Sequence, residues 1–330
     1  MIVNKDAGPY LDRTLDALSR QTVAPARVIV VDNASTDGSA DGLEDRYAFA
    51  EVHRLDENLG FAGGNNYGVR HAGEVDWIAL LNPDAFPEPD WLEALLGAAD
   101  ENADYSFFGS RLLDAARPET LDGTGDVFHV SGLAWRRDHG QPAGADEPGR
   151  GEIFSPCAAA AMYRRDAFEN VGGFDESFFA YFEDTDLSFR LRLAGHRCLY
   201  VPESVVLHVG SATTGRTSDF TIYHSLRNHV WAWAKNMPRP LVWRYLGHHL
   251  LANVMMMGVF IANGQARPVL RAKRDALRGL PRVLAERRKL QALPAGPEDI
   301  DALLDHGFGA YATGIRRAIK LKLLRGGSAV

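Results

Sequence analysis

Short apolar runs alternate with helical patterns through the first hundred residues of the chain. The β-branched run at 27–32 and the run at 76–84 each end in polar residues, as buried strands do where they reach a loop. An amphipathic stretch with Leu11, Leu15 and Leu18 precedes the first run. Strands that alternate with helices predict an α/β fold with a largely parallel sheet, which binds ligands at the carboxyl ends of its strands.

The chain begins within an expected strand. A first strand would end near residues 2–4, which leaves it almost no length and favours a natural start upstream of Met1. The first ten residues contain no basic region followed by an apolar run, so they predict no signal peptide.

The pattern changes twice after the first hundred residues. Residues 114–151 are rich in Gly, Pro and Asp and predict loops or a small irregular insertion. A helix at 183–195 and a strand at 198–209 follow, and the pattern is helical from about residue 219. We therefore expect an α/β domain at 1–218, with halves at 1–110 and 111–218, and a helical region at 219–330.

Charge divides the chain in the same place. The net charge is −7, but residues 221–330 hold 18 Lys and Arg against 6 Asp and Glu, whereas residues 1–220 hold 18 against 37. The basic tail indicates contact with the phosphates of lipid or nucleic acid, and a solvated helical face is the alternative. Two isolated cysteines, Cys157 and Cys198, favour a reducing cytoplasm over a disulfide scaffold.

Two stretches of the tail suggest a location. The apolar run at 250–262 is shorter than the roughly 20 residues that cross a bilayer, which predicts a core or interfacial helix. Residues 267–290 mix leucines with Arg and Lys, as membrane-surface helices do. The alternative is that 250–262 packs on the α/β domain or on a second copy of the chain in a homo-oligomer.

Polar residues follow the first apolar run at 30–39. Asp32 can accept a hydrogen bond from the ring N–H of a pyrimidine, and Asn33 and Ser35 can cap a following helix. The segment also fits a plain strand-to-helix turn.

Residues 57–69 form a second polar segment, rich in Gly and Asn. We interpret it as a loop that enters a helix, in which the backbone near Asn58, Gly63, Gly64 and Asn65 approaches phosphates. It matches neither the P-loop nor G-x-G-x-x-G, so a structural loop is the alternative.

Acidic residues follow the next strand and precede a later helix. Asp84, after Asn82 and Pro83, is suited to Mg²⁺ or Mn²⁺, although a turn with an exposed acid is the alternative. Residues 183–186 place three acids in four positions, more than helix capping needs, and such a carboxylate can act as a general base. His208, at the end of a strand, fits a metal ligand or phosphate contact, or a structural histidine.

The order of these segments resembles the family-2 glycosyltransferases of the GT-A fold, in their bacterial rhamnosyltransferase-like branch. The matching segments span about residues 2–230, and the most specific is the one from Gly172 to Asp186, GGFDESFFAYFEDTD. The resemblance implies a GT-A nucleotide-diphospho-sugar transferase fold with a C-terminal helical extension. It makes 1–110 the nucleotide-sugar-binding half and 111–218 the acceptor and catalytic half.

The resemblance also assigns roles. It implies that Asp184 is the general base, with Glu183 beside it, and that Asp84 and His208 hold a divalent cation, Mg²⁺ or Mn²⁺. The usual metal motif Asp-x-Asp reads Asn82-Pro83-Asp84 here, so metal dependence is weaker or needs another ligand. The implied donor site comprises Asp32, Asn33, Asn58, Gly63, Gly64, Asn65, Asn82, Asp84, Arg227 and Asn228.

The function so implied is inverting transfer from a nucleotide sugar to a glycan or glycolipid hydroxyl in cell-wall or polysaccharide biosynthesis. The branch favours dTDP-L-rhamnose, with UDP-galactofuranose or another UDP-sugar as the alternative. We expect a cytoplasmic enzyme, peripheral on the inner face of the membrane, without nucleic acid. A nucleotidyltransferase would need a Gly-rich, Lys-containing N-terminal signature, which the chain lacks. A carbohydrate- or nucleic-acid-binding protein would leave the carboxylates at the strand ends without a purpose.

Overall fold

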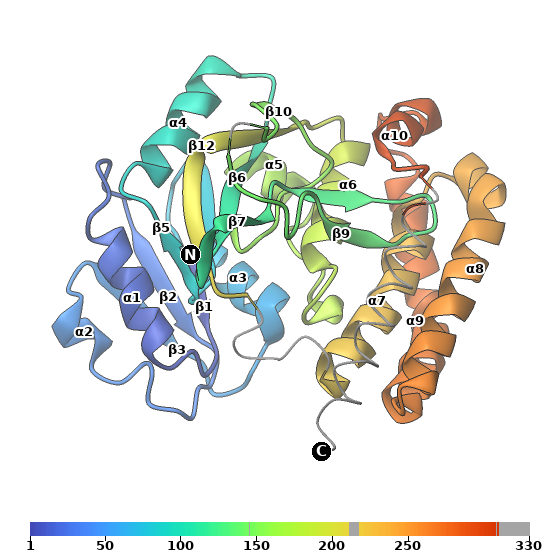
Figure 1. Cartoon of the computed structure of the whole chain (residues 1–330), viewed down its shortest axis with the longest axis horizontal. Coiled ribbons are helices and arrows are strands. Elements are labelled where there is room, and N and C mark those ends of the chain that lie inside the picture. Colours follow the sequence, from blue (N-terminus) through green and yellow to red (C-terminus); the bar gives the residue numbers. More distant parts are fainter. Residues whose placement is uncertain (145, 211–217, 308, 310–330) are drawn as a thin grey trace. The chain divides into compact units, whose positions relative to one another are not determined.

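The computed structural model describes residues 1–144, 146–210, 218–307 and 309. They form two compact units, one of residues 1–127 and 136–210 and the other of residues 128–135 and 218–307, coloured along the chain in Figure 1.

The N-terminal sheet of the first unit is parallel. Strand β2 (Val28–Asp32) lies between β1 (Ile2–Asn4) and β3 (Ala50–Arg54), and all five residues of β2 are buried. Burial on both faces explains the continuous apolar run, because a parallel sheet carries helices on each side. The predicted short first strand is present, and it is extended by a backbone hydrogen bond of 3.0 Å from Leu81 N to Met1 O.

A second, seven-stranded sheet is mixed, which corrects the expectation of a largely parallel sheet. Its order is β10-β12-β6-β11-β4, with β5 on β12 and β7 on β6, and only the pairing of β6 with β12 is parallel. The strands are β4 (Trp77–Leu81), β5 (Ala85–Pro87), β6 (Phe107–Asp114), β7 (Arg117–Gly123), β10 (Gly151–Glu152), β11 (Ala160–Arg164) and β12 (Cys198–His208). The apolar runs in the sequence do not reveal whether neighbouring strands are parallel or antiparallel, because that depends on which strands pair in the folded sheet.

Helices flank these sheets in the first unit (Figure 1). Leu11 and Leu15, expected on an apolar face, are fully buried in a core with Val30 and Leu95. The helices are α1 (Pro9–Leu18), α2 (Leu43–Arg46), α3 (Gly60–His71), α4 (Trp91–Glu101), α5 (Arg165–Asn170) and α6 (Glu183–Leu193), with a 3₁₀ turn at Glu176–Phe178.

The segment 114–151 is more ordered than its composition predicts. It holds β7 and a two-stranded sheet of β8 (Asp126–Phe128) and β9 (Ala134–Arg136). Strands of three residues are too short to show an alternating pattern in the sequence. They form because they pair with each other, so the local sequence does not predict them.

The second unit is helical, as expected. Helix α7 (Asp219–Asn236) packs on α9 (Ala266–Leu290) through a buried cluster of Ile222, Leu226, Val269 and Ala272. The remaining helices are α8 (Arg239–Ala262) and α10 (Pro297–Leu303).

Helix α8 is longer than the apolar run that it contains. By length and composition it could cross a membrane, which corrects the estimate made from 250–262, although such a helix in isolation is weak evidence of a span. It is the single helix of this kind within the described residues.

Candidate active site

Asp32 lies at the carboxyl end of β2, where the parallel sheet places it next to the end of β1. It is buried, and its Oδ1 accepts a hydrogen bond of 3.1 Å from Asn4 Nδ2. The same amide of Asn4 donates to Ser35 and Ser39. The sequence interpretation missed Asn4, whose side chain organises the turn that carries Asp32.

Asn33 does not cap a helix, because no helix follows it directly and α2 has no side-chain cap. Instead its Oδ1 accepts from Leu59 N at 2.8 Å and its Nδ2 donates to Asn58 Oδ1 at 2.9 Å and to Gly60 O at 3.0 Å. Asn33 therefore ties the end of β2 to the start of α3. Asn33 and Asn58, two of the asparagines assigned to donor binding, thus meet at this point.

The Gly-rich segment is mostly helix, which corrects its interpretation as a phosphate-binding loop. Gly63, Gly64 and Asn65 are buried within α3. A Cβ on Gly64 would lie 2.7 Å from Val3 Cγ1, and one on Gly63 would lie 2.7 Å from Leu59 Cβ. These glycines let α3 pack closely, and their part in donor binding stays a prediction.

Asp84 and His208 come together because β5 pairs with β12, opposing Ala85 to His208. Both side chains are buried, and His208 Nε2 lies 3.5 Å from Asp84 Oδ1. Burial opposes ionisation, but the proximity and charge of His208 outweigh it and lower the pKa of Asp84. Asn82, half-buried, directly follows β4 and lies two residues before Asp84 in the sequence.

Asp122, which the sequence interpretation missed, holds the other side of the imidazole. His208 Nδ1 donates to Asp122 Oδ2 at 2.7 Å, and Arg136 Nη1 makes a short ion pair with the same oxygen. His139 adds a contact of 3.4 Å to Asp122 Oδ1. Against the cost of burial, these partners hold the pKa of Asp122 well below its usual range.

The same partners act on the histidine. Burial disfavours the charged imidazole, but its hydrogen bond with Asp122 and the charge of the nearby Asp84 carboxylate raise the pKa of His208 above its ordinary value. The buried Nε2 has no hydrogen-bond partner among the described residues. An Nδ1–H fixed by a carboxylate leaves Nε2 available as a metal ligand facing Asp84.

The three acids at the start of α6 have different surroundings. Asp186 is fully buried and pairs with Arg190 at 2.9 Å, which gives it a structural role. Glu183 is buried, and its burial followed by the charge of Asp184 raises its pKa well above the usual value. Asp184 is half-buried and accepts a hydrogen bond of 2.7 Å from Thr185 N.

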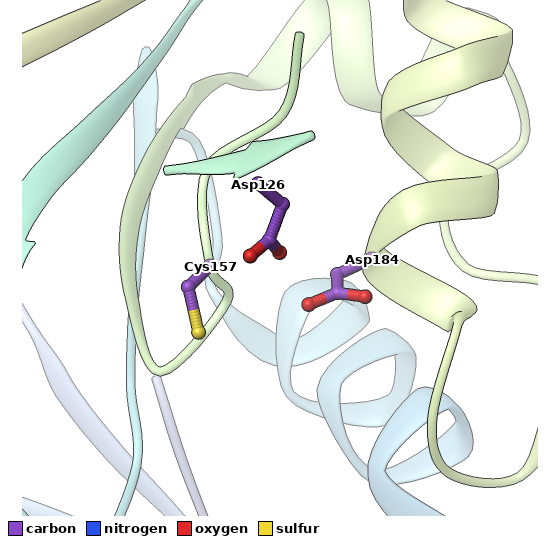
Figure 2. Close-up of side chains that lie close together, drawn as sticks. All are labelled: Asp126, Cys157 and Asp184. Carbon is purple, nitrogen blue, oxygen red and sulfur yellow. The ribbon is translucent and has the colours of Figure 1, made fainter. Parts of the chain in front are cut away.

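Figure 2 shows Asp184 beside Asp126 and Cys157, two more residues that were not predicted. One ligand atom from each of the three lies within 4.8 Å of the others. A divalent ion fits this group poorly, because the cation Arg136 interacts electrostatically with all three and burial raises the pKa of the Cys157 thiol. The group is better suited to holding protons.

Arg227 and Asn228 lie on α7 in the second unit, whereas all the residues above belong to the first. Arg227 Nε donates to Asn228 Oδ1 at 2.8 Å, and the guanidinium lies 4.4 Å from the ring centroid of Trp231. Their role at the diphosphate stays a prediction.

The amino-acid sequence of the chain is similar to those of known proteins. Residues 1–172 match the model of glycosyl transferase family 2, which is more than half of the chain. The chain belongs to glycosyl transferase family 2. This glycosyltransferase is 33% identical over 234 residues to the N-acetylglucosaminyl-diphospho-decaprenol L-rhamnosyltransferase of Mycobacterium tuberculosis, covering 65% of its own length and 76% of the relative. It is 26% identical over 215 residues to the O-antigen chain rhamnosyltransferase RfbN of Salmonella typhimurium, covering 63% and 65%.

Two solved structures share the fold of this glycosyltransferase. GalNAc-T7 with UDP, GalNAc and Mn²⁺ superposes with a TM-score of 0.59 at 16% identity, over 89% of this chain and 57% of that one. The mannosyltransferase PcManGT of Pyrobaculum calidifontis with GDP-Man and Mn²⁺ gives 0.50 at 17%, over 96% and 79%. The predicted GT-A fold is confirmed.

Proposed function

We propose that this glycosyltransferase transfers a sugar with inversion from a nucleoside-diphosphate sugar, dTDP-L-rhamnose being favoured, to a hydroxyl of a lipid-linked glycan. One observation carries the proposal: Arg136, the last member of the network Asp84–His208–Asp122–Arg136, also interacts electrostatically with the carboxylate of Asp184. Groups suited to a diphosphate and a group suited to a proton thus share one site.

The residues present fit the divalent cation that both structural neighbours hold. Asp84 and His208 would bind it, since a buried imidazole nitrogen without a hydrogen-bond partner faces a carboxylate of lowered pKa. When bound, such an ion neutralises negative charge on the leaving diphosphate. Asp32, at the end of β2, would orient the base of the nucleotide.

Asp184 carries the proton chemistry in this proposal. The acceptor O–H bond breaks and its proton passes to the carboxylate of Asp184. The acceptor oxygen bonds to the anomeric carbon, whose bond to the diphosphate oxygen breaks with its electron pair. Burial raises the pKa of Asp184, and this makes it a stronger base than an exposed aspartate. The role of Glu183 is to support this carboxylate from within α6.

The donor and acceptor rest on the relatives. Two of them are named as rhamnosyltransferases, and the name of one specifies a decaprenol-linked acceptor. UDP-sugars, including UDP-galactofuranose, remain the alternative donors.

An acceptor of that kind would place the enzyme at the cytoplasmic face of a membrane, and the second unit supports this location. Three leucines seven residues apart on α9 are 46–66% exposed, so they share one outward face: Leu270, Leu277 and Leu284. Arg271, Arg274 and Arg278 lie beside them with side chains at least 55% exposed. Leucine and arginine on one face suit an anionic lipid surface.

The experiment is a panel of nucleotide sugars, followed by mass spectrometry, with Mg²⁺, Mn²⁺ or EDTA. We expect slow hydrolysis of dTDP-L-rhamnose in preference to UDP-sugars, and transfer when a prenyl-diphosphate-linked N-acetylglucosamine is added. If a UDP-sugar is turned over and dTDP-L-rhamnose is not, the UDP-sugar would replace dTDP-L-rhamnose as the proposed donor. No turnover of any nucleotide sugar would contradict the proposal.

A further inference from the structure

Asp126 has no part in the mechanism above, yet its carboxyl group faces the proposed base. A carboxylate oxygen of Asp126 lies within 4.8 Å of one of Asp184, and Figure 2 shows both groups directed into the same space from β8 and α6. The backbone N of Asp126 donates to Ser155 O at 2.7 Å, which fixes the strand beneath the side chain.

The two carboxyl groups differ in their hydrogen bonds. Asp184 accepts from Thr185 N at 2.7 Å and, at 3.4 Å, from Ala158 N, and donors of this kind stabilise an ionised carboxylate. Within the described part of the chain, the carboxyl group of Asp126 has no hydrogen-bond donor. Of the two, Asp126 is therefore the group that keeps a proton.

The surrounding charges act in the same direction. Burial, followed by the charge of Asp184, raises the pKa of Asp126 to about 7. Asp122 on β7 adds to the rise, and Arg136 on β9 opposes it. Other titratable groups also interact with Asp126: Glu183 on α6, whose pKa burial raises strongly, Tyr163 on β11, and the thiols of Cys157 and Cys198.

The spacing fits one oxygen atom between the two groups. A hydroxyl group has one hydrogen to donate and lone pairs with which to accept. Two O–H···O bonds of about 2.7 Å that meet at one oxygen at a tetrahedral angle join atoms about 4.5 Å apart. If both carboxyl groups were ionised, one would face the lone pairs of the hydroxyl.

We propose that Asp126 is a second catalytic carboxyl group, which is protonated in the active enzyme and donates a hydrogen bond to the acceptor oxygen while Asp184 takes the proton of that oxygen. This rests on the proposed function, because it assumes that Asp184 is the base. The two groups hold the nucleophile from both sides and direct its free lone pair at the anomeric carbon. The proton of Asp126 is not consumed, so the reaction balance is unchanged.

The test compares Asp126→Asn, whose amide also donates but does not titrate, with Asp126→Ala and with Asp45→Asn on the exposed surface. The readout is hydrolysis of dTDP-L-rhamnose between pH 5 and 9, with water as the acceptor. We expect the wild-type rate to fall above about pH 7, as Asp126 ionises. Asp126→Asn should lose this alkaline fall, Asp126→Ala should be about 10- to 100-fold slower than the wild type below pH 7, and Asp45→Asn should match the wild type.

Two results would overturn the inference: an unchanged alkaline limb in Asp126→Asn, or an unimpaired Asp126→Ala. If Asp126→Ala does not fold, the isosteric Asn variant still decides. A second readout needs no activity. In protein labelled with ¹³C at the aspartate carboxyl carbons, the resonance missing from Asp126→Asn should titrate between about pH 6 and 8. Titration near pH 4 would contradict the inference, whereas an inactive wild type with the expected titration would count against the proposed function only.

Discussion

His208 Nδ1 lies 2.7 Å from Asp122 Oδ2, so a buried carboxylate holds the imidazole from the side opposite Asp84. This contact decides which ring nitrogen carries the hydrogen and which faces Asp84. It also connects β7, in a segment without recognisable motifs, to the end of β12.

The first prediction concerns this contact. Asp122→Ala should weaken Mn²⁺-dependent binding of dTDP or UDP by about 10- to 100-fold, as loss of such an orienting carboxylate does at metal sites. The nucleotide affinity of Asp122→Asn should lie between those of the wild type and Asp122→Ala, because its amide oxygen can still accept a hydrogen bond from His208 Nδ1. Calorimetry with and without Mn²⁺ measures the effect, and Asp114→Asn on the neighbouring strand serves as the control. Equal affinity for all variants would show that Asp122 does not orient the ligand.

The second prediction concerns Asp84. Asp84→Ala should abolish the difference between nucleotide affinities measured in Mn²⁺ and in EDTA, because it removes one of the two proposed ligands. Asp100→Ala, on the exposed face of α4, should keep that difference. If the wild-type protein itself binds dTDP and UDP equally in Mn²⁺ and EDTA, the metal role of Asp84 is wrong.

The sequence predicted Asp84 but not Asp122, and the reason is physical. Asp84 and His208 each follow an apolar run, and Asp184 lies where a helical pattern begins, so the local pattern reveals the end of a strand or the start of a helix. Asp122 and Asp126 lie in LDGTGDVF, whose glycines predict a loop. Two acids that flank Gly-Thr-Gly next to buried apolar residues were the available signal.

Helices were predicted better than sheets for a related reason. The 3.6-residue period of α1 is local, and Leu11 and Leu15 are buried as expected. Strand direction and the β5–β12 pairing depend on contacts that are distant in sequence. The glycines of α3 were misread because a glycine needed for packing and one needed for a phosphate look the same in a sequence.

The third prediction concerns acid stability of the second unit. His249 and His229 are buried and both donate to Ser131 O, at 2.8 and 3.1 Å. Burial lowers the pKa of His249 to about 4, and that of His229 falls well below its usual value. The unfolded state therefore binds more protons below the ordinary histidine pKa, so stability is full above about pH 6.5 and is lost as the pH falls toward 4.

Urea unfolding followed by circular dichroism from pH 7.5 to 4.5 checks this. His249 contributes roughly 3 kcal/mol of the expected loss, because burial lowers its pKa to about 4. His249→Gln keeps a donor for Ser131 but cannot titrate, so its stability should depend less on pH. An identical pH dependence in this variant would contradict the assignment.

The fourth prediction concerns the exposed leucines of α9. Replacing Leu270, Leu277 and Leu284 together by Ser should lower binding to phosphatidylglycerol vesicles by at least about tenfold. Each substitution removes apolar surface area that would enter the lipid. Phe49→Ser, which removes an exposed apolar side chain from the first unit, is the matched control. Truncation after residue 262 is unsuitable, because it would remove Val269 and Ala272 from the core with α7.

Vesicle co-sedimentation at low and high salt gives the readout. Binding by the wild type should fall as salt rises, since the arginines beside the leucines act electrostatically. Phosphatidylcholine vesicles should bind less than anionic ones. No binding to anionic vesicles at low salt would reject the proposed location at the membrane surface, and the exposed leucines of α9 would then need a different binding partner.

The fifth prediction concerns Asp184 as the general base. Turnover by Asp184→Asn is the most direct test, measured at saturating nucleotide sugar with dTDP affinity determined on the same sample. We predict a rate lower by about 10²–10⁴-fold, as general base catalysis contributes, with nucleotide affinity unchanged because Asp84 and His208 remain. Near-native turnover by Asp184→Asn would contradict the account, since the carboxylate of Asp184 would then not be needed to take the acceptor proton.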